Sequence, residues 1–109
     1  MLFDVRTADR DGWSLATVVG DLDLATLPAL RTALGQLEGG SVGLDLSDVA
    51  YLDAVVLGVV LGARVKARRM GGDFVVVCPP GGARDLLAET GVDAVLTVLA
   101  SLDELEPAQ

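Results

Sequence analysis

The sequence predicts an α/β domain in which about five strands form a mixed sheet and about four helices cover it, in the order ββαβαβαβα. Two observations predict this class. Short runs that are continuously apolar or alternate with polar residues suit strands, and a longer run among them carries leucine at helical spacing. Glycine pairs at 39–40 and 71–72 separate several of the runs. We expect 1–106 to form one domain, followed by a short tail over 107–109.

The first part of the chain predicts a hairpin and then a helix. Its expected elements are strand 3–8, turn 9–12, strand 13–19 and helix 27–38. Four leucines recur at helical spacing within the helix. Thr26 is a suitable N-cap, and Pro28 falls in the first turn, where no backbone N–H is needed.

The middle of the chain predicts a strand, a turn, a helix and a second strand. These elements are strand 42–46, turn 47–52, a helix over about 55–70 and strand 74–78. The helix begins with β-branched residues that would also suit a strand, but its length of about sixteen residues favours a helix. Residues 74–78 are continuously apolar, as expected of a buried strand in a parallel sheet.

The last part predicts helix 83–90, strand 95–99 and a short acidic helix over 102–106. Gly91 suits the end of the first of these helices, and Ser101 suits the N-cap of the second. The only disorder that we expect is in the tail.

Composition and charge exclude several classes of function. The net charge of −8 would repel nucleic acids and anionic membranes, and the lack of histidine removes Ser-His-Asp and Cys-His catalysis. No basic and apolar leader precedes Phe3, and the apolar run 54–63 is about half of what a membrane-spanning helix needs. We therefore expect a cytoplasmic protein without a cofactor, a nucleic acid partner or a membrane-inserted segment.

Basic residues gather in one place, late in the second predicted helix. They are Arg64, Lys66, Arg68 and Arg69. Cations near the end of a helix interact favourably with its last carbonyl groups, so we interpret the cluster as helix-end charge. A docking patch for an acidic partner is the alternative.

Cys78 and Arg84 have the C-x5-R spacing of the phosphate-binding loop of cysteine phosphatases. That loop needs successive backbone N–H groups, and Pro79 and Pro80 each remove one. Asp85 would also place negative charge beside a phosphate. We favour a buried cysteine at the end of a strand and keep the phosphatase as a remote alternative.

Aspartates offer two further possibilities for chemistry. Asp21 and Asp23 follow an apolar strand, as the paired aspartates of phosphoaspartyl transferases do, but Ala25 stands where that motif has a hydroxyl. Three more could gather round Mg²⁺ at one edge of the sheet: Asp45, Asp48 and Asp53. Turn and cap roles are commoner for aspartate, so we expect no metal site.

Four further stretches extend over nearly the whole chain: 18–26, 44–47, 52–53 with 57–62, and 91–93. In this order they resemble the STAS domain of bacterial anti-sigma factor antagonists. The resemblance implies a STAS-like sheet and a non-enzymatic domain that binds a serine kinase serving as the anti-sigma factor. In such a family, phosphorylation by the kinase switches the antagonist off, and a phosphatase restores it.

The chain departs from the family at the phosphorylation site. The family's phosphoacceptor is the second serine of an Asp-Ser-Ser-Gly-Leu-Gly stretch, which aligns with Val55. Ala54, Val55 and Val56 replace the two serines and the glycine. The resemblance therefore implies a degenerate phosphoacceptor position, with no hydroxyl left to accept a phosphoryl group.

Two hypotheses follow: an antagonist that is uncoupled from phosphorylation, or a structural STAS subunit of a larger stressosome-like or transporter-associated assembly. We expect a monomer or a weak homodimer. Because the start of the second helix is apolar all round, at least one of its two valines should lie near the surface. The predicted partner-binding residues are Asp21, Asp23, Thr26, Asp53, Ala54, Val55, Val56, Leu57 and Arg64.

Overall fold

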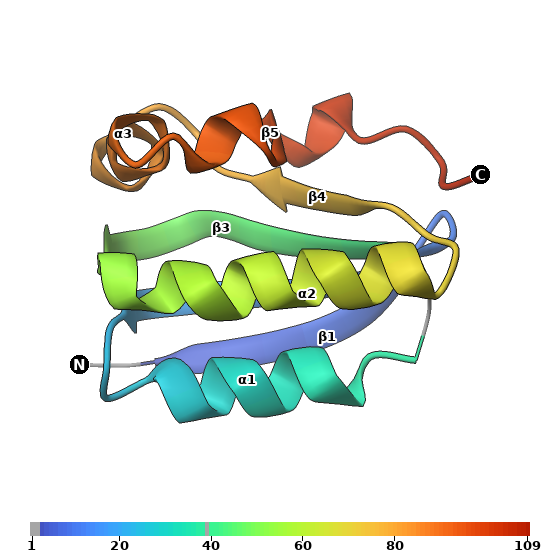
Figure 1. Ribbon diagram of the computed structural model, residues 1–109, viewed down its shortest axis with the longest axis horizontal. Helices are drawn as coiled ribbons and strands as arrows, with labels where there is room; N and C mark the ends of the chain where they lie inside the picture. Colours follow the sequence, from blue (N-terminus) through green and yellow to red (C-terminus); the bar gives the residue numbers. More distant parts are fainter. Residues whose placement is uncertain (1–2, 39) are drawn as a thin grey trace.

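A five-stranded sheet with two long helices packed side by side against one face forms the centre of the computed structural model, which describes residues 3–38 and 40–109 (Figure 1). The strands are β1 (Asp4–Arg10), β2 (Trp13–Leu22), β3 (Val42–Leu52), β4 (Phe74–Val77) and β5 (Thr97–Leu99). They lie in chain order across the sheet. β1 is antiparallel to β2, and every other neighbouring pair is parallel, so the predicted mixed sheet is confirmed.

The described residues contain three α-helices rather than about four. They are α1 (Leu27–Gln36), α2 (Leu57–Arg69) and α3 (Gly82–Glu89), with 3₁₀ turns at η1 (Ala54–Val56), η2 (Val92–Ala94) and η3 (Leu102–Glu104). The expected fourth helix is only η3. Ser101 caps it as predicted, but the chain leaves the helical conformation at Leu105. η2 occupies part of the segment between α3 and β5, and therefore the last strand begins later than expected.

The β1–β2 hairpin turns at Asp11 and Gly12, which both have positive φ, of 50° and 87°. Two left-handed residues give the turn the twist that joins antiparallel strands, and Asp-Gly is a favoured pair for it. Arg10 and Trp13 are the last paired residues before the turn. The predicted hairpin is confirmed, although both strands are longer than expected.

β3 continues to Leu52 instead of ending in a turn at 47–52. Its pairing with β2 slips twice, because one extra residue of β3 is accommodated after Asp45 and another after Val49. At the first slip the Asp45 Oδ1 atom accepts hydrogen bonds from the Ser47 backbone N–H at 3.0 Å and the Ser47 hydroxyl at 2.6 Å. These two β-bulges break the simple alternation, so the sequence looks like a turn although the chain stays in the sheet.

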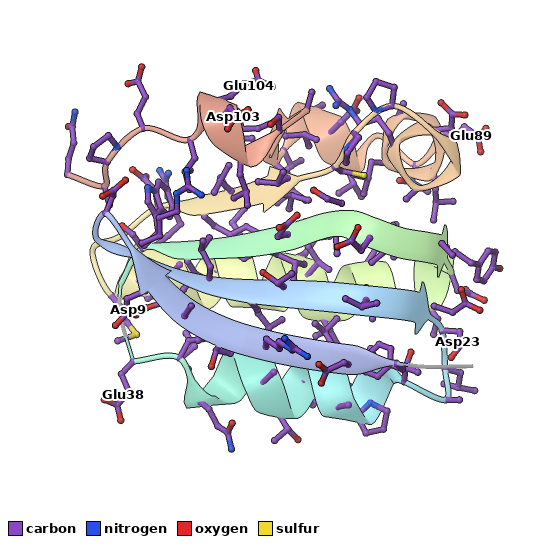
Figure 2. The ribbon with its side chains drawn as sticks, turned by 180° about the vertical axis from the view of Figure 1, so that it is seen from behind. Asp9, Asp23, Glu38, Glu89, Asp103 and Glu104 are labelled. Carbon is purple, nitrogen blue, oxygen red and sulfur yellow. The ribbon has the colours of Figure 1, made fainter. Side chains whose placement is uncertain are left out.

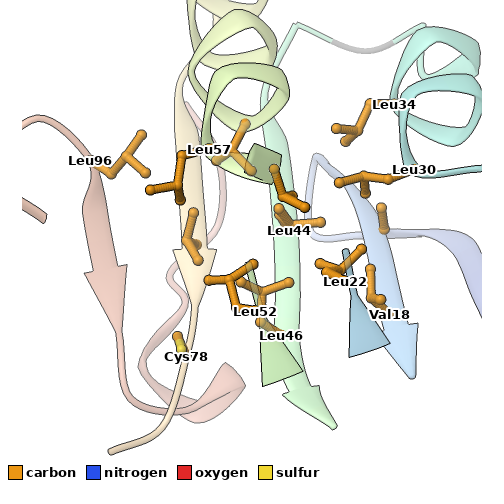
Figure 3. Close-up of a cluster of buried hydrophobic side chains, with 14 of the residues drawn as sticks. Val18, Leu22, Leu30, Leu34, Leu44, Leu46, Leu52, Leu57, Cys78 and Leu96 are labelled. Carbon is orange, nitrogen blue, oxygen red and sulfur yellow. The ribbon is translucent and has the colours of Figure 1, made fainter. Parts of the chain in front are cut away.

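The main core lies between the sheet and the helices (Figure 3). Alternate side chains of the central strands point into it, including Val18, Leu44 and Leu46. α1 contributes three leucines at helical spacing, and α2 contributes Leu57 and Val60. Burying each such side chain stabilises the fold by roughly 1.5–3 kcal/mol, so this one layer of contacts fixes where both helices begin.

A second, smaller cluster lies on the opposite face of the sheet, and the C-terminal segment packs against it. In Figure 2 this segment runs along the β4 side of the sheet and ends near the β1–β2 turn. Trp13 and Leu15 form the base of the cluster, and Leu105 and Ala108 pack over them. The Trp13 indole Nε1–H donates to the Glu106 carbonyl oxygen at 2.7 Å, and the Ala108 N–H donates to the Asp11 carbonyl oxygen at 2.9 Å. The expectation of a disordered tail is therefore wrong for Ala108.

Candidate functional site

Two loops meet at the edge of the sheet where β2 and β3 end (Figure 1). The first, 23–26, leads into α1, and the second, formed by Asp53 and η1, leads into α2. The Asp53 N–H donates to the Leu22 carbonyl oxygen at 2.8 Å and ties the two loops together. Binding sites of α/β domains usually lie at the carboxyl ends of parallel strands. All the predicted contact residues except Arg64 belong to this edge.

The first loop is held by its own polar side chains. The Asp23 Oδ1 atom accepts from the N–H groups of Ala25 at 3.0 Å and Thr26 at 3.2 Å. The Thr26 hydroxyl donates to the Asp21 carbonyl oxygen at 2.8 Å and accepts from the Asp23 N–H at 3.0 Å. Thr26 therefore does not cap α1 with its side chain, contrary to the prediction, because its hydroxyl is already used within the loop.

The second loop is organised by Asp53. The extended backbone of Asp53 places its Oδ1 atom 2.9 Å from the Val55 N–H, which donates to it, so Asp53 is the N-cap of η1. The Tyr51 hydroxyl lies 3.5 Å from the other carboxylate oxygen. The second helix, expected from about residue 55, thus starts as a 3₁₀ turn and becomes an α-helix at Leu57.

The two valines of η1 point in opposite directions. Val55 is 45% exposed, whereas Val56 is fully buried in the main core. The expectation that at least one would reach the surface is confirmed. The side chains of Val56 and Leu57 both pack into the core, so their inclusion among the surface contacts is corrected: α2 turns this face towards the sheet.

Two exposed apolar side chains beside Val55 were not predicted. Leu24 is 71% exposed in the first loop, and Tyr51 is 53% exposed at the end of β3, where it pairs with Asp21. A large apolar residue inside a polar turn could have pointed to Leu24, but no comparable signal marks Tyr51. We call the following surface residues at this edge the corner: Asp21, Asp23, Leu24, Thr26, Tyr51, Asp53, Ala54 and Val55.

Arg64 does not belong to the corner. It lies two turns further along α2 and lines a cavity of about 500 Å³ with Arg68, Trp13 and the C-terminal segment. Lys66, Arg68 and Arg69 are in the last turn of α2, the position that their interpretation as helix-end charge requires.

Cys78 is unsuited to act as a nucleophile. It is 1% exposed, and burial raises the pKa of its thiol, an effect that the nearby Arg84 charge only partly opposes. The Arg84 guanidinium donates to the Cys78 carbonyl oxygen at 2.9 Å, so it holds the chain rather than facing an open phosphate loop. The geometry gives the C-x5-R phosphatase alternative no support.

Two of the three aspartates considered as Mg²⁺ ligands are engaged in local hydrogen bonds. Asp45 binds Ser47, and Asp53 caps η1. In the part of the chain that the structure describes, no three acidic, thiol or imidazole groups come close enough to hold a metal ion. Over residues 3–38 and 40–109, no helix has both the length and the apolar character that crossing a bilayer requires.

Comparisons with known proteins agree on one family. The model of the STAS domain matches residues 4–105. An anti-sigma factor antagonist from Mycobacterium paratuberculosis is 26% identical, with a TM-score of 0.84 over 94% of this chain and 90% of that chain. The Bacillus cell fate determinant SpoIIAA in its phosphorylated form is 18% identical, with a TM-score of 0.65 over 94% and 95%, a likeness of fold alone. No curated protein sequence matches the chain. With the family model matching almost its entire length, the chain belongs to the STAS domain family.

Proposed function

We propose that this STAS domain is an anti-sigma factor antagonist that binds a kinase-type anti-sigma factor through the corner and is not switched off by serine phosphorylation. The observation that carries the proposal is Val55, which is 45% exposed beside Asp53 at the start of α2. In the family that the chain resembles, the phosphoacceptor serine stands at this position. An apolar contact thus replaces the hydroxyl while the helix start remains capped.

The hydroxyl groups of Thr26 and Ser47 are already engaged in hydrogen bonds. The Thr26 hydroxyl is bound between Asp21 and Asp23, and the Ser47 hydroxyl donates to the buried Asp45. Moving either group into a kinase active site would break these hydrogen bonds. This supports the view that no neighbouring serine or threonine takes over the role of the missing acceptor.

The corner has the make-up of a protein interface. Leu24, Tyr51 and Val55 supply exposed apolar area, and Asp23 and Asp53 border it with negative charge. An apolar centre with a polar rim is typical of surfaces that bind proteins, and a buried tyrosine contact often contributes much of the affinity. We therefore propose the corner, without Val56, Leu57 and Arg64, as the contact surface.

Binding to purified candidate kinase-type anti-sigma factors tests the proposal, with ADP and then with ATP. We expect a complex on size-exclusion chromatography that survives ATP, and no gain of phosphate mass on this chain. Val55→Asp should abolish the complex because it replaces an apolar contact by a further carboxylate beside Asp53. Val65→Asp is the matched control, since Val65 is 44% exposed on another part of α2.

Two results would contradict the proposal in different ways. ATP-dependent phosphorylation of this chain with loss of the complex would overturn the unregulated antagonist. Failure to bind any kinase-type partner, together with stable assembly into a large particle with other STAS proteins, would instead favour the structural-subunit hypothesis.

A further inference from the structure

An open apolar groove runs between α1 and α2. These two helices lie side by side on one face of the sheet (Figure 1). The groove has a volume of about 580 Å³, with Leu27 and Leu34 on the α1 side and Val59 and Met70 on the α2 side. Val55 lines the end nearest the corner and is the one residue that the groove shares with it. The groove is therefore a second surface, and the inference below does not depend on the proposed function.

The charges around the groove are all positive. Arg31 lines it from α1 and Lys66 from α2, and no carboxylate is among its lining residues. The Lys66 ammonium group reaches towards the other helix and lies 3.4 Å from the Gly35 carbonyl oxygen. This is unusual for a chain with sixteen acidic and eight basic residues. The groove is thus complementary in charge to an acidic partner.

Three glycines inside the helices also line the groove: Gly35, Gly58 and Gly62. A methyl group added at any of them would meet no atom within 4 Å, so the packing within this domain does not require glycine there. Each glycine within a helix costs about 0.5–1 kcal/mol relative to alanine. Because glycine has no side chain, the groove stays open at these points and another backbone can approach closely.

We infer that the groove binds an amphipathic helix of a partner protein, with apolar side chains on one face and acidic residues along both edges of that face. The α2 wall from Val55 to Met70 is about 22 Å long, at 1.5 Å per residue, which matches a helix of about fifteen residues. The apolar face fills the space between the two walls, and the acidic edges pair with Arg31 and Lys66. An amphipathic helix in an apolar groove is a common mode of peptide recognition.

A designed peptide provides the probe. It is a fluorescent helix of about fifteen leucine, alanine and glutamate residues, with glutamates along both edges of the leucine stripe. Its control peptide has lysine at each glutamate position. We expect saturable binding of the acidic peptide only, with backbone amide NMR shifts concentrated on the groove walls of α1 and α2.

Two kinds of variant separate the groove from the corner. Gly62→Leu adds an apolar side chain to the groove at a position where a Cβ would meet no atom within 4 Å, and it improves helix propensity. It should therefore weaken binding of the peptide by about tenfold or more while the fold persists. Thr32→Leu on the exposed side of α1 is its control. Arg31→Glu with Lys66→Glu should weaken binding similarly, whereas Arg10→Glu with Arg69→Glu should not.

Several outcomes would overturn the inference. Equal binding of the acidic and the lysine peptide would show that Arg31 and Lys66 do not select an acidic partner. Backbone amide NMR shifts confined to the corner would place the contact outside the groove. Self-association of the chain that Gly62→Leu abolishes, without peptide binding, would assign the groove to a second copy. Groove shifts with submicellar dodecanoate but not with the peptide would assign it to a small amphiphile.

Discussion

The Asp53 carboxylate accepts a hydrogen bond of 2.9 Å from the Val55 N–H, so the same aspartate that borders the corner also fixes the conformation of its central apolar residue. The backbone at the start of η1 is thereby satisfied without any bound anion. The helix start needs no hydroxyl at residue 55, since the cap relies on Asp53 and not on the side chain of that residue.

Asp53→Ala should lower the free energy of unfolding by about 1 kcal/mol, because the Val55 N–H loses its acceptor. Urea denaturation followed by circular dichroism measures the change. Asp53→Asn is the matched control, since asparagine caps helices about as well and should stay close to the original chain. Equal stability of the alanine variant would mean that water replaces the cap without loss.

Val56→Ala should destabilise the domain by about 2 kcal/mol, since it removes a fully buried side chain. Val55→Ala, one residue earlier, should change stability by less than about 0.5 kcal/mol because Val55 is half exposed. The urea concentrations at which the Val55→Ala and Val56→Ala variants are half unfolded provide the comparison. If both results hold, glycine could not be placed at 56 without a loss of stability, whereas serine could be placed at 55.

Leu105→Ala should shift the fluorescence emission of Trp13, the only tryptophan, to longer wavelength. Leu105 packs on the small cluster around Trp13, so its truncation lets water reach the indole ring. Asp103→Ala in the neighbouring exposed turn should leave the emission unchanged. An unshifted spectrum for Leu105→Ala would show that the C-terminal segment does not shield the indole.

Stability should fall as the pH rises above about 9, and Cys78 should contribute to the fall. Burial raises the pKa of the Cys78 thiol above its ordinary value of 9.0, so the unfolded chain loses this proton at lower pH than the folded chain does. The folded state is then disfavoured progressively between the two pKa values. Urea titrations at several pH values from neutral to alkaline measure the free energy of unfolding. This free energy should decline less steeply with pH for Cys78→Ala than for the original chain. Identical slopes would contradict this role.

Local patterns predicted most of the fold. Leucine spacing predicted α1, the Asp-Gly turn predicted the first hairpin, and the continuous apolar run predicted β4. Each of these signals depends on a few neighbouring residues. The extension of β3 was missed because its two bulges produce a spacing that matches neither a regular strand nor a helix.

The candidate site was harder to predict in detail, because exposure at an element's end depends on tertiary packing. Val55 and Val56 have the same side chain, yet the rotation of η1 against the core leaves one exposed and buries the other. Arg64 was assigned to the corner by its place on the helix, but it projects towards the C-terminal segment. Tyr51 became recognisable as exposed only once its pairing with Asp21 was known.

The two bulges of β3 let this strand carry two residues more than the stretch of β2 that it pairs with, while its later side chains stay on their proper faces. Its inward-facing residues are spaced by two up to Leu46 and then by three, to Val49 and Leu52. Because each bulge absorbs one extra residue, deleting Ser47 or Ala50 would return the local spacing to two and keep Leu52 inside. A single deletion between Val42 and Leu46, where no bulge absorbs it, would instead exchange the inner and outer faces of the residues on one side of it. Length variants of this strand should therefore be tolerated at the bulges and lost in its regular first half.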